Sequence, residues 1–190
     1  MFMRKFMFDL TEGSAGAADL VFKFMRRGME AHIGQPDMEP VLLVVRKSGA
    51  AYLCGVGHWF CDSNTKTGFA DALCAGIDLA NRLGDPLVVV SLLAEYAARF
   101  VPPGDAEGDP EEVDQQDVMM LTVETPERCR VELFKVLRDG EGVITELTAE
   151  ELGTLGARSA GRLLNLFQKA DARAHGVSVE NYLEAEKTLH

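Results

Sequence analysis

The clearest pattern in the sequence lies between residues 41 and 93, where short apolar runs flank one segment of helical periodicity. Residues 41–45 form a continuous run of valine and leucine, which is typical of a buried strand. A turn signal at residues 47–49 and a second apolar run at 51–56 predict a β-hairpin. Residues 87–93 are apolar at nearly every position, so we predict a central strand that is covered on both faces.

The segment between the hairpin and the central strand predicts an amphipathic helix. Apolar residues recur at helical spacing between positions 69 and 80, and residues 63–65 are all suitable N-cap residues. Gly84 is suited to the left-handed conformation that often follows a helix, and Asp85-Pro86 cannot continue one. We therefore expect the helix to end near Leu83.

The flanking segments predict further elements of the same sheet. Residues 2–10 predict a strand, and residues 14–31 predict a helix with one apolar stripe that packs on the sheet. Strand-like runs follow at 118–124, 129–138 and 143–147, and the turn signals between them predict an antiparallel meander.

Four segments have weaker patterns. We predict one or two helical turns at 94–101 and a mobile acidic surface loop at 104–117. The spacing of Thr148 and Glu151 matches a capping box and predicts a short helix there, and residues 158–190 predict C-terminal helices, the first of which ends near residue 174.

Together these elements predict one α+β domain over residues 1–190, with a mixed β-sheet made of the hairpin, the central strand and the meander, and with helices packed against it. The predicted core comprises Leu43, Val45, Leu53, Phe69, Leu73, Ile77, Val88, Val90, Leu121, Val131, Leu133, Leu164 and Phe167.

Charge and cysteine content narrow the functional classes. The formal net charge of −11 argues against a general affinity for nucleic acid, and seven of the acidic residues lie within 104–117. No apolar run is long enough for a signal sequence or a membrane span. The four cysteines lie in apolar runs without a disulfide framework, which indicates a reducing compartment. We therefore expect a cytoplasmic protein.

Cys54, His58 and Cys61 are the best candidates for metal ligands, because three soft ligands stand within eight residues. Cys74 or Cys129 could complete a tetrahedral zinc site. The spacing is not one of the usual paired patterns, however, and alternate strand residues point to opposite faces. The same residues could instead form a Cys/His nucleophilic pair. We favour structural thiols and expect no cofactor.

A basic stripe on the first C-terminal helix is the candidate surface for binding a partner. Arg158, Arg162, Lys169 and Arg173 fall on one side of that helix, and the acidic loop supplies the opposite charge. Patches of opposite sign favour docking to a protein partner or self-association. We predict a homodimer that forms through an exposed sheet edge or through the C-terminal helices.

Part of the chain resembles the middle of a ribonuclease H-like domain. The order strand, strand, helix, strand carries Asn64-Thr65 before the helix, Ala70-Asp71-Ala72 in its first turn and Ser91-x4-Tyr96 at the last strand. The resemblance implies two-metal chemistry with one acid at the end of the first strand, one in the helix and one after the next strand.

The acids of that family map only in part onto this chain. The first position corresponds to Asp9 and the second to Asp71, whereas the third falls on Leu93, which cannot bind a metal. Glu95 is the nearby acid that could take its place. The resemblance therefore implies at most a degenerate nuclease or phosphoesterase with Asp9, Asp71 and Glu95 as its catalytic residues.

Residues 69–147 are similar to a loosely defined group of uncharacterised bacterial α+β proteins. The shared features are a helix, the strand at 87–92, an aromatic at Tyr96, an acidic loop, and an antiparallel pair that opens at Asp117-Val118-Met119-Met120. This resemblance implies a fold and no activity.

No Gly-rich phosphate loop, Gly-x-Ser-x-Gly elbow or His-Glu-x-x-His motif occurs in the sequence. We therefore hypothesise a non-catalytic binding or accessory protein, with the metal-dependent nuclease or phosphoesterase as the alternative.

Overall fold

A single seven-stranded sheet forms the centre of the molecule, which a computed structural model describes for residues 2–99, 115–150 and 163–176. The strands run in the order β1-β3-β2-β4-β5-β6-β7, and every pair of neighbours is antiparallel. Their bounds are β1 Met3–Met7, β2 Val41–Arg46, β3 Ala50–Gly55, β4 Leu87–Arg99, β5 Gln115–Glu124, β6 Cys129–Arg138 and β7 Ile144–Glu150.

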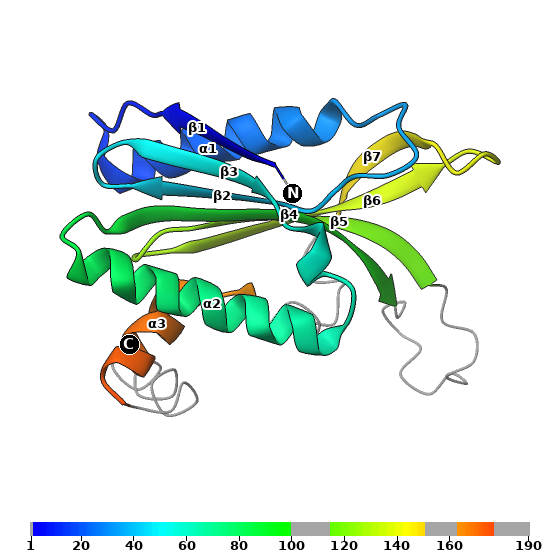
Figure 1. Cartoon of the computed structure of the whole chain (residues 1–190). Coiled ribbons are helices and arrows are strands. Elements are labelled where there is room, and N and C mark those ends of the chain that lie inside the picture. The colour runs from blue at the N-terminus through cyan, green and yellow to red at the C-terminus, as the bar shows by residue number, and fades with distance from the viewer. Residues whose placement is uncertain (1, 100–114, 151–162, 177–190) are drawn as a thin grey trace.

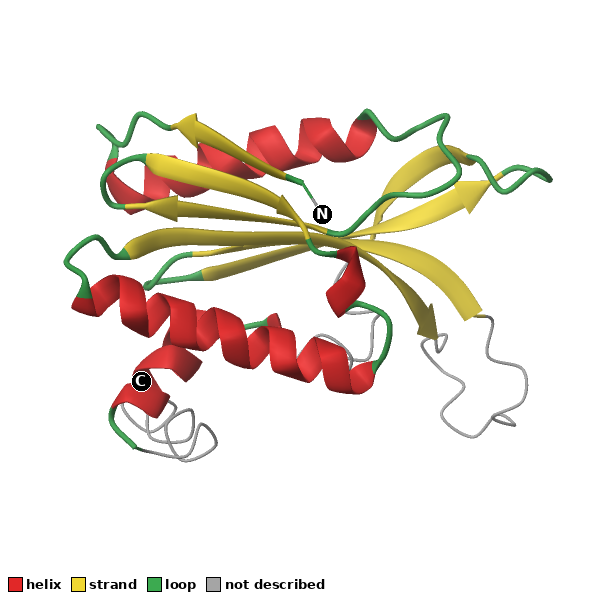
Figure 2. Ribbon diagram, in the orientation of Figure 1, coloured by secondary structure: helices red, strands yellow, loops and turns green. Residues whose placement is uncertain are grey.

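Helices cover both faces of this sheet. Helix α1 (Gly13–Glu30) lies on one face, while α2 (Ser63–Arg82) and α3 (Leu166–Ala174) lie on the other (Figure 1, Figure 2). A short 3-10 turn, η1 (Gly57–Trp59), joins β3 to α2. The predicted α+β class is confirmed. None of the helices in the described ranges is both long and apolar enough to cross a membrane.

The sheet is antiparallel throughout, although the sequence predicted a mixed one. The reason is the path of the two helical crossovers. Helix α1 joins β1 to β2, which are separated by β3, and α2 joins β3 to β4, which are separated by β2. Strands joined by a helix therefore run parallel without being neighbours. The predicted hairpin, central strand and meander are all confirmed.

The boundaries of α2 are determined by local chemistry. Asp62 is the N-cap: its carboxylate accepts hydrogen bonds from the backbone N–H groups of Asn64 and Thr65, and the Thr65 hydroxyl accepts one from the Asp62 N–H. The cap is thus one residue before the predicted group. Gly84 has a φ of 78°, as predicted for the residue that follows the helix.

Three predicted elements are corrected by the structure. Residues 94–99 are not helical, because β4 continues to Arg99 and pairs with β5 from Val90 to Arg99. Thr148 lies in β7 and Asp117 lies in β5, so neither the predicted capping box nor the end of the predicted acidic loop is correct. In each case, strand pairing outweighs the local signal.

The C-terminal helix also starts later than predicted, at Leu166. The remainder of the predicted acidic loop, the rest of the short helix after residue 150 and the last helix lie outside the described residues.

Apolar clusters on the two faces form the core. Of the predicted core residues, the buried ones are Leu43, Val45, Phe69, Ile77, Val90, Leu121, Leu133 and Phe167. The half-buried ones are Leu53, Leu73, Val88, Val131 and Leu164. Strands β4 and β5 are covered on both faces. Their pairing register therefore determines which residues lie next to one another at each end of the sheet.

Candidate binding site

The linker between α1 and β2 forms one wall of a pocket at the end of the sheet. Met38 is buried in the core beneath α1 and anchors the linker, while its neighbours Asp37 and Glu39 remain exposed. One Asp37 carboxylate oxygen accepts a hydrogen bond of 2.8 Å from the Met38 backbone N–H. The linker therefore presents two carboxylates from fixed backbone positions.

Gly55, the last residue of β3, and Gly57, just after it, allow the linker to approach closely. A β-carbon on Gly55 would lie 2.5 Å from Oε1 of Glu39, and one on Gly57 would lie 3.3 Å from Cγ of the same residue. The backbone N–H of Val56 also donates to the carbonyl of Pro40 over 2.8 Å. The two glycines thus leave room for the Glu39 side chain in its present position.

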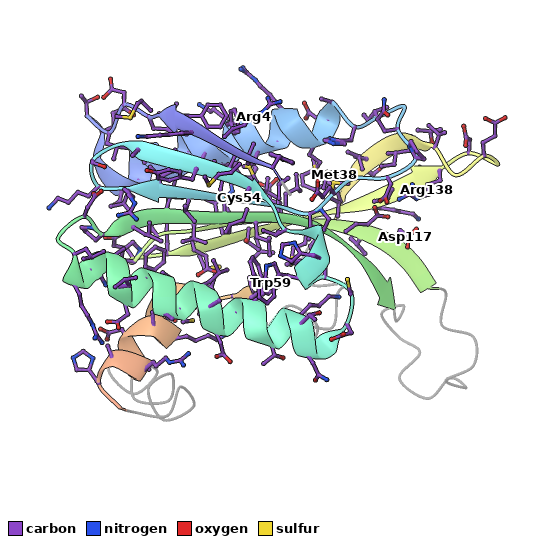
Figure 3. All side chains as sticks on the ribbon, viewed as in Figure 1. Arg4, Met38, Cys54, Trp59, Asp117 and Arg138 are labelled. Carbon is purple, nitrogen blue, oxygen red and sulfur yellow. The ribbon has the colours of Figure 1, made fainter. Side chains whose placement is uncertain are left out.

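Arg138, at the end of β6, connects the residues of the other wall through hydrogen bonds and ion pairs. Its Nη2 donates to Oε1 of Glu95 on β4 over 2.5 Å, and its Nη1 donates to the carbonyls of Pro36 and Gly142. Its Nε lies 3.5 Å from a carboxylate oxygen of Asp117 on β5. Arg138 and Asp117 stand together at this end of the sheet (Figure 3). The side-chain hydrogen bond with Glu95 raises the pKa of Arg138, so the guanidinium stays charged.

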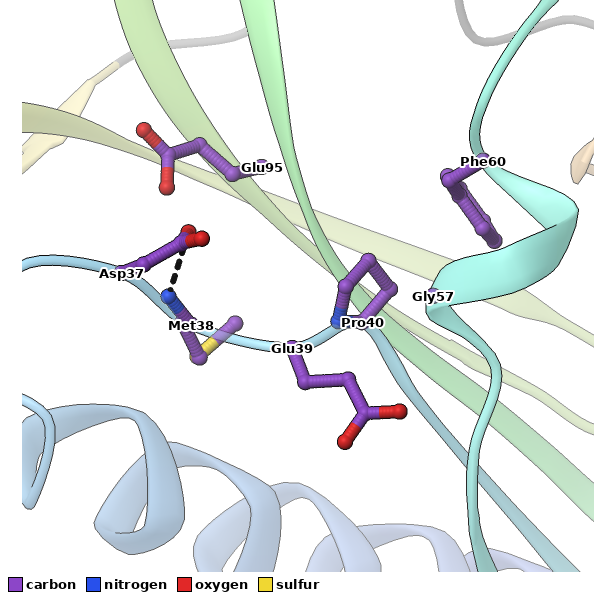
Figure 4. Close-up of a pocket in the computed structure, with 7 residues that line it drawn as sticks. All are labelled: Asp37, Met38, Glu39, Pro40, Gly57, Phe60 and Glu95. Atoms are coloured by element: carbon purple, nitrogen blue, oxygen red, sulfur yellow. Dashed lines mark hydrogen bonds between the residues drawn. The ribbon is translucent and has the colours of Figure 1, made fainter. Parts of the chain in front are cut away.

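These two walls border an open pocket of about 500 Å³. Its lining residues are Asp37, Met38, Glu39, Pro40, Gly57, Phe60 and Glu95. Figure 4 shows the Asp37 and Glu95 carboxylates on one side of the linker and Phe60 across Pro40, with Glu39 directed towards the β3 side. Three acids and one aromatic ring thus line a hollow of the size that binds small groups in proteins.

The second oxygen of Glu95 is the unusual atom of this site. Oε2 has almost no contact with solvent and has no hydrogen-bond partner within the part of the chain that the structure describes. A buried carboxylate oxygen without a donor is energetically unfavourable. Because Glu95 also lines the pocket, a donor bound there could satisfy this oxygen once the side chain turns towards it, and a charged donor would interact best with the surrounding acids.

A second buried carboxylate, Glu124, lies at the other end of β5. It is 1% exposed, and its Oε2 accepts a hydrogen bond of 2.7 Å from the backbone N–H of Leu166, the first residue of α3. Its Oε1 has no partner among the described residues, and the adjoining cavity measures only about 20 Å³. That volume holds about one water molecule.

The ionisable side chains around Glu124 are, like Glu124 itself, partly withdrawn from solvent. Loss of solvation raises the pKa of Glu124 and of the Cys74 thiol, and it lowers the pKa of the Lys169 ammonium. Although Cys129 is exposed as a residue, desolvation and then the charge of Glu124 raise the pKa of its thiol to about 12. All of these shifts disfavour charge, so we interpret this cluster as the anchor of α3.

Comparisons of the chain with family models, curated proteins and solved structures found no match. The function must therefore be argued from the geometry of the sites themselves.

The structure separates the three acids of the nuclease alternative. An Asp9 oxygen accepts a hydrogen bond from Thr11 N–H, Asp71 on α2 pairs with Arg173 over 3.4 Å, and Glu95 is bound by Arg138. Within the described ranges, no three His, Cys, Asp or Glu side chains form a group suited to a metal ion.

Cys54, His58 and Cys61 are likewise not gathered into one ligand set. Cys54 is half-buried on β3, and burial raises the pKa of its thiol. His58 is exposed and its ring stands 5.2 Å from that of Trp59, while the Cys61 thiol donates to the His58 carbonyl.

The predicted basic stripe is only partly described. Arg158 and Arg162 lie outside the described residues. Lys169 is half-buried against the sheet, and Arg173 is exposed and paired with Asp71. The two described members stand four residues apart on α3 and therefore lie on the same side of that helix, and their role in binding a partner stays a prediction.

Sequence reasoning missed most of the pocket. Asp37, Glu39 and Arg138 stand in or beside turn segments, where charged residues are common and carry no distinct signal. The usable signal was Gly55-x-Gly57 directly after a strand, because glycine there indicates a close approach of other atoms.

Proposed function

We propose that the protein is a non-catalytic binding protein and that the pocket around Glu95 receives a cationic side chain of a protein partner. The single observation that carries this proposal is the buried Oε2 atom of Glu95, which lacks a donor among the described residues and lies beside a second carboxylate, Asp37. A lysine or arginine of the partner would supply both the donor and the charge.

The electrostatics of this end of the sheet support the proposal. Asp37, Glu39, Glu95 and Asp117 are four carboxylates, and Arg138 is the cation that contacts two of them. The chain as a whole has a net charge of −11. Such a surface attracts basic partners and repels polyanions, so a basic protein surface fits better than nucleic acid.

The shape of the pocket supports the same class of ligand. Pro40 and Phe60 give it an apolar side on which the aliphatic stem of lysine or arginine can pack. The Phe60 ring already attracts one cation, because Nζ of Lys66 lies 5.7 Å from its centre. The pocket can thus accommodate both the apolar stem and the charged head of a lysine or arginine side chain.

The described lining residues include no serine, threonine, cysteine, histidine or lysine, and their ionisable groups are the carboxylates of Asp37, Glu39 and Glu95. One of these carboxylates, that of Glu95, is bound by Arg138. All four cysteines are free in the structure, which agrees with a reducing compartment such as the cytoplasm. No observation favours the nuclease or phosphoesterase alternative.

The fluorescence of Trp59 offers a direct test, because it is the single tryptophan and stands between the pocket residues Gly57 and Phe60. We would titrate the protein with an octapeptide of alternating arginine and glycine, and with the matching glutamate peptide. The basic peptide should give a saturable change that weakens in high salt, and the acidic peptide should give none.

A matched pair of variants separates the pocket from general charge. Asp37→Asn with Glu39→Gln should weaken the basic peptide roughly tenfold, because each exposed contact contributes about 1 kcal/mol or less. Asp71→Asn with Glu30→Gln removes the same charge away from the pocket and should change the affinity little. Equal losses in both pairs, or no binding of the basic peptide to the unmodified protein, would refute the proposal.

A further inference from the structure

Strand β1 forms one edge of the sheet, and half of its backbone groups point away from the sheet. The register shows which groups these are, because Phe8 N–H donates to the Gly49 carbonyl of the neighbouring hairpin. Bonded positions alternate along an antiparallel strand, so the even-numbered residues of β1 face β3. The N–H and carbonyl groups of Met3, Lys5 and Met7 therefore point outwards, and they have no backbone partner among the described residues.

The side chains at this edge combine apolar surface with positive charge. Met3 and Met7 are 67% and 69% exposed. Arg4 and Lys5 stand between them and are exposed as well. Neither cation forms an ion pair with a residue that the structure describes, and Nζ of Lys5 stands 5.9 Å from the centre of the Tyr52 ring. Cross-strand pairing at this edge therefore favours a strand in which apolar residues flank acids.

Helix α1 extends the same kind of surface beside the edge (Figure 1). Phe24 is 39% exposed, and its ring packs edge-on against Phe6 of β1, with the centres 5.7 Å apart. On the same flank of the helix, Leu20 is 43% exposed, and Arg27 is exposed without an ion pair inside the described ranges. A strand added to β1 would therefore meet apolar and basic side chains on its α1 side too.

We propose that β1 binds an extended acidic segment of a partner protein, which joins the sheet as a further antiparallel strand. Antiparallel pairing matches every other pair of neighbours in the sheet. A second copy of β1 fits less well, because full antiparallel overlap would place two Lys5 side chains opposite each other. Lysine at an edge strand thus disfavours pairing with a copy, whereas an acidic segment gains from it. The proposal does not depend on the Glu95 pocket.

The register predicts the sequence of the bound segment. Its residue opposite Lys5 shares the face of Lys5 and should be acidic, and the residues two positions away stand opposite Met3 and Met7 and should be apolar. Between them, the residue opposite Arg4 should be acidic, and the residue opposite Phe6 should be apolar because it lies beside α1. Read from its N-terminus, the segment is therefore apolar, apolar, acidic, acidic, apolar.

A short peptide tests this pairing with the full chain. The probe is Ser-Val-Leu-Glu-Glu-Val-Ser with both ends blocked, and the control peptide has lysine in place of both glutamates. At saturation, the probe should slow hydrogen exchange of the Met3, Lys5 and Met7 amides roughly tenfold or more, because these amides gain hydrogen-bond acceptors. The control peptide should leave their exchange unchanged. No retardation by the probe, or equal retardation by both peptides, would overturn the proposal.

Methylation of the peptide backbone separates strand pairing from attraction between charges alone. In the proposed register, the N–H of the first glutamate faces β1, and the N–H of the leucine before it faces away. N-methylation of that glutamate should weaken binding roughly tenfold or more, because it removes a donor of the ladder. N-methylation of the leucine should change the affinity little. Equal losses from the two modifications would contradict an added strand.

Charge reversal in the protein tests the assigned contact at Lys5. Lys5→Glu should weaken the acidic probe roughly tenfold and should allow the lysine peptide to bind, because the opposing charges are exchanged. Arg173→Glu makes the same change of charge on α3, far from β1, and should affect neither peptide (Figure 1). Equal effects of the two variants would overturn the assignment. Sedimentation that shows a dimer dissociated by the probe would assign the edge to a second copy instead.

Discussion

Glu95 and Glu124 belong to the same strand pair: Glu95 stands opposite Met119 in the middle of the paired stretch, and Glu124 stands opposite Val90 at its end. Each has one carboxylate oxygen engaged and one buried oxygen without a donor among the described residues. Glu95 pairs with a guanidinium beside a hollow of about 500 Å³, whereas Glu124 accepts a backbone N–H beside a cavity of about 20 Å³.

The difference shows that burial alone does not identify a binding site. The Glu95 residue lines a hollow that a ligand can enter, and nearby acids favour a cation there. At Glu124, α3 closes the site. The pKa values of Cys74, Cys129 and Lys169 are all shifted in the direction that favours the neutral form. We therefore assign binding to Glu95 and anchoring of α3 to Glu124.

Removal of the cation at Glu95 should have the largest effect on stability. Arg138→Met leaves a carboxylate that is four-fifths buried without its partner, and we expect a loss of about 2–3 kcal/mol in urea unfolding, less than for a fully buried pair. Glu95→Gln should cost about 1 kcal/mol, because the amide still accepts a hydrogen bond.

The double variant sharpens this test. Because a neutral glutamine amide in place of Glu95 needs no counter-charge, Arg138→Met with Glu95→Gln should be clearly more stable than the sum of the two single losses predicts. Strict additivity would mean that Arg138 stabilises the fold through Pro36 and Gly142 rather than through Glu95.

Cys129 should react more slowly than its exposure suggests. With a pKa of about 12, against an ordinary value of 9.0, the thiol should react with iodoacetamide at pH 8 roughly thirtyfold more slowly than an unperturbed thiol. Glu124→Gln should speed the reaction, because the charge of Glu124 is the second cause of the raised pKa. Mass spectrometry of the tryptic peptide measures both rates, and an unchanged rate in the variant would contradict the assigned contact.

The smallest effect we expect is the pH dependence contributed by Glu124. Burial raises the pKa of Glu124 in the folded protein, so the folded chain binds that proton more tightly than the unfolded chain does. Stability from this group is therefore greatest below the ordinary pKa of 4.5 and falls as pH rises towards the folded pKa. Glu124→Gln should lack this decline.

Urea unfolding of both proteins between pH 4 and 8 would measure that difference. Glu30→Gln, a change at an exposed carboxylate of α1, corrects for the loss of one negative charge. The stability of the unmodified protein relative to Glu124→Gln should fall with rising pH, and a rising difference would have the wrong sign for a desolvated acid.

Prediction from sequence was most successful where the pattern and the packing agree. The hairpin, α2 and the central strand were predicted because apolar periodicity and turn residues both mark them, and Leu43, Ile77 and Leu121 are buried as expected. The strand character of residues 94–99 was missed because pairing with β5 is a contact between segments far apart in the chain.

The sites were harder to predict, for a related reason. Glu95 was selected as a substitute metal ligand, but its partner Arg138 comes from β6 and its neighbour Asp37 from the linker before β2. Glu124 was not selected, because a single acid at the end of a strand gives no sign that a helix 42 positions later will bury it.

Local sequence alone determined the alternation of strands and helices, the caps of α2 and the excess of acid, because these depend on side-chain periodicity, turn chemistry and composition. Only the tertiary structure decided which acids are bound by arginine and which are closed off by a helix. Those outcomes depend on the order of the strands, since a carboxylate acquires its partner, its burial and its pKa from segments brought beside it by the fold.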